Sequence, residues 1–66
     1  MKTLEQVFDK AVEIENEAAE KFNRTSLADQ YYIKNNVIFN ETGSVLFDPE
    51  NEGVSDGILF DFANEE

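Results

Sequence analysis

The sequence contains no cysteine, histidine or tryptophan, and its five basic residues are outnumbered by fifteen acidic ones. Without cysteine the chain has no disulfide, no thiol nucleophile and no thiolate-based zinc site. Without histidine it lacks the usual general base near neutral pH and the commonest metal ligand in proteins. Only carboxylate chemistry remains, and 66 residues leave little scaffold for a substrate cleft. We therefore expect no enzymatic activity, no cofactor and no bound metal.

The shortage of basic residues also argues against direct binding to nucleic acid or to membranes. Duplex affinity comes largely from lysine and arginine that neutralise phosphates, whereas the formal net charge here is -10. The same imbalance disfavours anionic membrane surfaces. The longest apolar runs, such as 31–33 and 58–60, are three residues long, too short for a membrane span or a signal peptide. We expect a cytoplasmic protein.

The proportion of apolar residues predicts a folded chain in spite of the acidity. Hydrophobic residues make up 41% of the sequence and aromatic residues 12%, which is more than acidic disordered segments usually carry. The length predicts a single small domain over residues 1–66.

Residues 3–22 show the pattern of an amphipathic helix. Thr3 and Gln6 have the spacing of a capping box, which marks a helix start. Residues 23–26 are poor helix formers, so we expect the helix to stop near Phe22. Apolar residues recur between these points at helical spacing: Leu4, Val7, Phe8, Ala11, Val12, Ile14, Ala18, Ala19 and Phe22.

Glu15 interrupts this apolar stripe. A buried carboxylate is costly unless it is paired or protonated. Three interpretations stay open: the stripe is only partly covered at Glu15, or Lys34 or a tyrosine hydroxyl pairs with it inside the fold, or it lies at a partner or dimer interface.

The opposite face of the same helix carries a row of acids, which we call the acidic ridge. Like charges at i,i+4 spacing each cost a helix a few tenths of a kcal/mol. The row is either a solvated face that keeps the protein soluble or a surface that binds a basic partner. Its members are Glu5, Asp9, Glu13, Glu17 and Glu20.

Three tetrads in the second half share one pattern: two aliphatic residues, a phenylalanine, then Asn or Asp. They predict strands over 37–40, 44–48 and 57–62. Residues 26–33 read either as a second short helix or as the start of a strand. The expected fold class is α+β, with the N-terminal helix packed on a three-stranded antiparallel meander.

Side-chain alternation along these strands predicts an uncovered apolar row. We expect the odd-numbered residues 37, 39, 45 and 47 to face the helix, together with 58, 60 and 62. Ile38, Leu46 and Leu59 would then form an aliphatic row on the other face, available to a partner or to a second copy in a homodimer.

The loop over residues 48–56 partly resembles a calcium-binding EF-hand loop. Oxygen-bearing residues fall at positions one, three, five and nine, with glycine at six. Position twelve should be a bidentate glutamate, but it is Leu59, and the flanks read as strands. We expect a plain acidic loop rather than a divalent-cation site.

These features together predict a protein that works by binding another protein with a basic surface, such as one that binds nucleic acid. In its concrete form it is an inhibitor or decoy, a DNA mimic whose carboxylates replace phosphates. Small acidic inhibitors of phages and mobile elements are similar in size and charge, although no motif is shared. An immunity protein or antitoxin against a basic toxin is the alternative, and a homo-oligomeric accessory subunit is an alternative of another class.

Overall fold

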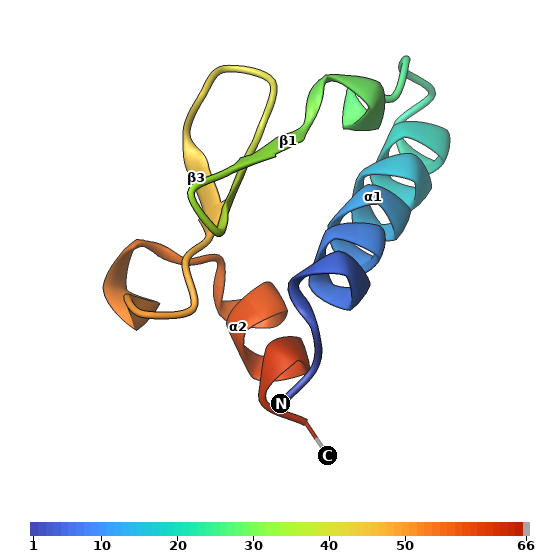
Figure 1. The fold of residues 1–66 in the computed structure, drawn as a ribbon. Coiled ribbons are helices and arrows are strands. Elements are labelled where there is room, and N and C mark those ends of the chain that lie inside the picture. Colours follow the sequence, from blue (N-terminus) through green and yellow to red (C-terminus); the bar gives the residue numbers. More distant parts are fainter. Residues whose placement is uncertain (66) are drawn as a thin grey trace.

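A computed structural model describes residues 1–65 and confirms the α+β class. An N-terminal helix, a three-stranded antiparallel sheet and a short second helix follow one another along the chain (Figure 1). Because the sheet order is β1-β2-β3, the strands form a meander, the expected topology, although one of its three strands differs from those expected.

Helix α1 spans Leu4–Lys21, within one residue at each end of the helix expected over 3–22. The capping box is formed: the Thr3 hydroxyl oxygen accepts from the backbone N–H of Gln6, and the Gln6 side chain accepts from that of Thr3. At the other end Asn23 takes a left-handed conformation with φ of 52°. The backbone N–H of Arg24 then donates to the carbonyl of Ala19 at 2.8 Å, a Schellman ending.

Residues 26–36 resolve into a turn followed by a strand. A single 3-10 turn, η1, spans Ala28–Gln30, and β1 follows at Tyr32–Lys34. A tight hairpin then leads into β2, Val37–Phe39. Asn35 and Asn36 both have positive φ, 53° and 66°, which is the backbone of a type I′ turn and suits asparagine.

The expected strand over 57–62 is wrong, because this segment is helix α2, Gly57–Ala63. The Asp56 carboxylate caps it by accepting from the backbone N–H groups of Ile58 and Leu59. Helical spacing then places Leu59 and Ala63 on one buried face. The third strand of the sheet is β1 instead, since β3 at Val45–Phe47 lies on the far side of β2.

The expected assignment of strand faces is wrong for β2 and correct for Phe47 of β3, which is 2% exposed in the core. Ile38 is 0% exposed and lies opposite Phe47, while Phe39 pairs with Val45 and stacks on Tyr32. Between these two pairs the chain advances by one residue on β2 but by two residues on β3. Strand β3 therefore carries a bulge, which shifts the alternation of its side chains between the two sheet faces. With apolar residues at successive positions of β2, alternation alone does not decide which face is buried.

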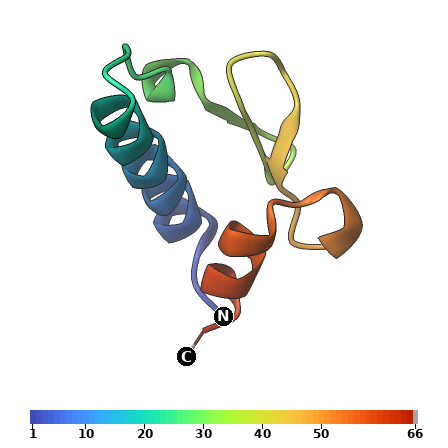
Figure 2. The same ribbon diagram turned by 180° about the vertical axis from the view of Figure 1, so that it is seen from behind.

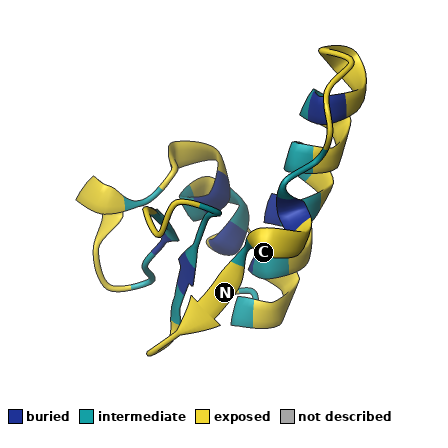
Figure 3. Cartoon of the chain, turned by 90° about the horizontal axis from the view of Figure 1, so that it is seen from above, coloured by how far each residue is buried: buried dark blue, intermediate teal, exposed yellow. Residues whose placement is uncertain are grey.

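The core lies where α1, the sheet and α2 meet. In Figure 3 the buried parts of the helices and strands face one another, and the outer sides are exposed. The N-terminus lies beside the end of α2 (Figures 1 and 2), because the Lys2 backbone N–H donates to the Ala63 carbonyl at 2.8 Å. The core residues are Val7, Ala11, Ile38, Phe47, Leu59 and Ala63.

Candidate functional site

The acidic ridge is presented to solvent along α1. All five of its residues are exposed, while Val7 and Ala11 on the other side of the helix are buried. Exposure leaves each carboxylate in contact with water and accessible to a partner. The sequence therefore places these five residues correctly on one outer face, whereas their binding role stays a prediction.

One ridge residue has a basic partner within residues 1–65. Lys10 Nζ lies 3.0 Å from Glu13 Oε1, one helical turn away. The hydrogen bond to Glu13 and the charge of that carboxylate raise the pKa of Lys10 above its usual value. Lys10 also lies 5.5 Å from the centre of the Phe62 ring on α2, and Lys2 lies 4.5 Å from the same ring. One flank of the ridge therefore carries cations held against α2.

Glu15 is held inside the fold by its own chain. Its side chain is 11% exposed, and its carboxylate lies 2.6 and 3.1 Å from the two terminal nitrogens of Arg24. The backbone N–H of Leu27 donates to it at 2.9 Å. Arg24 first, and then Leu27, lower the pKa of Glu15 to about 2 against the opposing effect of burial.

This arrangement corresponds to the internal pairing foreseen for Glu15, but with a different base. The base that pairs with Glu15 is Arg24 and not the expected Lys34. The sequence feature that indicates this pairing is Asn23 directly after the helix. A left-handed residue at that position turns the chain, and with it Arg24, back toward α1. With its carboxylate already engaged, Glu15 fastens the segment after α1 to the helix.

The apolar row expected on the outer sheet face does not exist as a surface. Ile38 and Leu59 are core residues, 0% and 3% exposed. Leu46 is half-buried and packs against the same core, as the bulge in β3 brings it to that side. The three residues meet inside the protein, so the expectation that they face a partner or a second copy is wrong.

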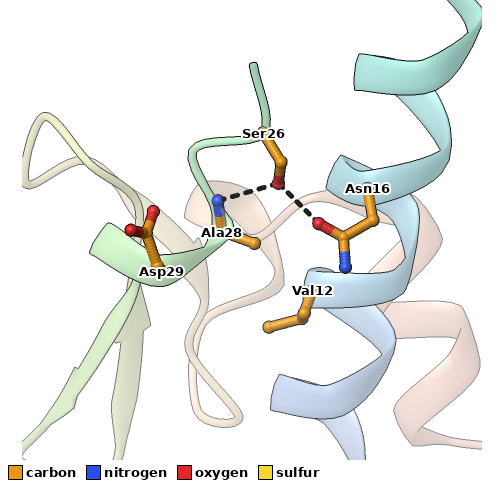
Figure 4. A pocket seen from close by; sticks show the side chains of 5 residues that line it. All are labelled: Val12, Asn16, Ser26, Ala28 and Asp29. Atoms are coloured by element: carbon orange, nitrogen blue, oxygen red, sulfur yellow. Dashed lines mark hydrogen bonds between the residues drawn. The ribbon is translucent and has the colours of Figure 1, made fainter.

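A groove between α1 and η1, which the sequence did not indicate, lies beside the ridge. It is an open depression of about 440 Å³, lined by Val12 and Asn16 of α1 and by Ser26, Ala28 and Asp29 (Figure 4). The Ser26 hydroxyl donates to Asn16 Oδ1 and accepts from the backbone N–H of Ala28. Figure 4 shows that these bonds turn the amide oxygen of Asn16 toward Ser26 and leave its Nδ2 pointing away.

The loop over residues 48–56 is organised by its own turns. Asp48 Oδ1 accepts from the backbone N–H of Glu50, and Asn51 Oδ1 accepts from that of Gly53. The hydroxyl of Ser55 bonds both Asp48 and Asn51. Among residues 1–65 no three acidic side chains gather in a way that could hold a metal ion. None of the helices within that range has the length and apolar character needed to cross a membrane.

Comparison with protein families, with curated proteins and with solved structures found no match. The case for a function therefore rests on the surfaces of this chain itself.

Proposed function

We propose that this protein binds the basic surface of another protein through the acidic ridge. In that complex it acts as a cytoplasmic inhibitor or decoy, a DNA mimic that covers a nucleic-acid-binding surface. The observation that carries the proposal is the exposure of Glu5, Asp9, Glu13, Glu17 and Glu20 along one face of an 18-residue helix.

The spacing of these charges supports the proposal. Four of them follow one another at i,i+4, which is about 6 Å along a helix axis. Phosphates of one DNA strand are about 3.4 Å apart in axial rise. The ridge therefore offers about one charge for every two phosphates, on a helix whose backbone is already formed before binding.

The cost of the ridge to the isolated protein supports it as well. Each i,i+4 acidic pair destabilises a helix by a few tenths of a kcal/mol, and within residues 1–65 Lys10 is the base that pairs with the ridge. A complementary basic partner would remove this repulsion, and the net charge of -10 would speed the encounter.

The test compares three immobilised baits in nuclease-treated lysate of the native source or host: wild type, Glu13→Lys/Glu17→Lys and Glu50→Lys/Glu52→Lys. Both double variants change the net charge equally, but Glu50 and Glu52 lie in the loop away from the ridge. We expect wild type and the loop variant to retain the same nucleic-acid-binding protein, the ridge variant to lose it, and duplex DNA to displace it.

Two other outcomes have defined meanings. Equal retention by the ridge variant would make the ridge a solubility face and refute the proposal. A partner that depends on the ridge but ignores added DNA would instead indicate neutralisation of a basic toxin, the role of an immunity protein or antitoxin.

A further inference from the structure

The groove between α1 and η1 adjoins the acidic ridge on the helix surface. Residues three or four apart on a helix are neighbours, so Val12 lies next to Asp9, and Asn16 lies next to Glu13 and Glu20. None of the groove residues is a lysine or arginine, whereas the other flank of the ridge carries Lys10. A basic partner laid on the ridge therefore meets repulsion on one flank and an acidic groove on the other.

The lining of the groove combines an apolar floor with two polar ends. Val12 and Ala28 supply aliphatic surface between the helix and the 3-10 turn. The Asn16 Nδ2 group is a free donor on one side, because the Ser26 bond fixes the amide oxygen (Figure 4). Asp29 on the other side is exposed, and its carboxylate makes no hydrogen bond or ion pair within residues 1–65. The volume of about 440 Å³ falls in the range of protein binding pockets.

We propose that this groove receives an arginine side chain of the partner whose basic surface contacts the ridge. The inference rests on the proposed function and names the anchoring residue of the partner. The methylene stem covers Val12 and Ala28, as long basic side chains do over apolar surface. The guanidinium group pairs with the Asp29 carboxylate in a two-point contact, and Asn16 Nδ2 donates to a backbone carbonyl of the partner.

The chemistry of the groove favours arginine over lysine. A guanidinium group is planar, presents several donors in a fixed geometry and is more weakly hydrated than an ammonium group. It therefore loses less on entering a half-apolar groove, and it satisfies both oxygens of Asp29 at once.

The inference is tested by titrating the ¹⁵N-labelled full chain with blocked hexa-arginine and hexa-lysine peptides at low salt. We expect hexa-arginine to shift the backbone amides of Ala28 and Asp29 and the side-chain amide of Asn16, together with the ridge amides. Asp29→Asn should weaken hexa-arginine about three- to fivefold, the upper range for an exposed ion pair. The matched control Asp61→Asn removes one exposed acid from α2 and should leave the affinity unchanged. Hexa-lysine should shift the groove amides less.

Each remaining result refutes a defined statement. If the amide shifts are confined to the ridge, and Asp29→Asn and Asp61→Asn bind hexa-arginine equally well, the proposal of an arginine site in the groove is refuted. The proposed function would still stand. Shifts confined to the groove that survive Glu13→Lys/Glu17→Lys would overturn the role of the ridge. No shift at either place with either peptide would overturn both.

Discussion

Glu15 shows how one side chain can satisfy a position that the helical pattern marks as apolar. It sits in the buried stripe of α1, yet Arg24 and the backbone of Leu27 supply donors to its carboxylate. The same contacts join the helix to the chain that follows it. A charged residue here therefore adds a side-chain link to the turn that Asn23 makes after α1, a link that an alanine in its place would remove.

Replacing Glu15 should destabilise the fold in a way that depends on pH. We expect Glu15→Gln to lower the free energy of unfolding at pH 7 by about 1–2 kcal/mol, a value reduced because Arg24 is 42% exposed and water screens the pair. The folded-state pKa of about 2 lies below the ordinary 4.5. The stabilisation is thus complete above about pH 5 and is lost as the pH falls through about 2.

Urea unfolding of wild type and Glu15→Gln across this pH range measures the effect. Glu17→Gln is the matched control, since Glu17 is exposed on the ridge and should change stability by no more than about 0.5 kcal/mol. A difference between wild type and Glu15→Gln that stayed constant down to pH 2 would show that the carboxylate charge is not what stabilises the fold.

At the level of elements, the sequence predicts the parts whose signals are local. The capping box and the helical period define α1, and the tetrads at 37–40 and 45–48 contain β2 and β3. The tetrad at 58–61 has the same residue pattern and forms a helix, because the capping residue Asp56 precedes it and Leu59 and Ala63 share a buried face. A short apolar run fits either structure until its neighbours in space are known.

In the candidate site, too, the features with local sequence signals could be predicted and those that depend on distant contacts could not. The ridge could be read from the helical period alone, since every member belongs to one element. The pairing of Glu15 with Arg24 and the groove beside Asn16 arise where the chain returns to α1 after Asn23. The burial of Ile38, Leu46 and Leu59 depends on the bulge in β3 and on the position of α2. No local sequence pattern indicates either feature, so their exposure was predicted wrongly.

Helix α2 should depend on its capping residue. We expect Asp56→Ala to lower the free energy of unfolding by about 1 kcal/mol, as it leaves the backbone N–H groups of Ile58 and Leu59 without their acceptor. Asp61→Ala removes an equal charge from the same helix and serves as the control in thermal and urea unfolding. Equal effects of the two variants would mean that lost charge, rather than the lost cap, explains the change.

For the whole molecule, the net charge of -10 on 66 residues opposes compaction. Salt screens this repulsion, and the Debye length falls to about 10 Å at 0.1 M. We therefore expect the Tm of the isolated protein to rise by several degrees between about 10 and about 200 mM NaCl. Salt also weakens the exposed Lys10–Glu13 ion pair, which lowers the Tm by a smaller amount.

Calorimetry at several salt concentrations checks this expectation. The double variant Glu50→Gln/Glu52→Gln makes the net charge less negative at positions away from the ridge and the core. The Tm of this variant should therefore rise less steeply with salt than the Tm of wild type. A Tm of wild type that stays flat or falls with added salt would contradict self-repulsion as a main term in its stability.

The pairing of α1 with α2 also has a consequence for biosynthesis. Val7 and Ala11 leave the ribosome before their core partners Leu59 and Ala63, which follow much later in the sequence. The contacts of the β1–β2 hairpin are local in sequence, but the apolar stripe of α1 lacks its partners until α2 emerges. Chains that stall before α2 emerges would present proteases with an uncovered apolar stripe on α1.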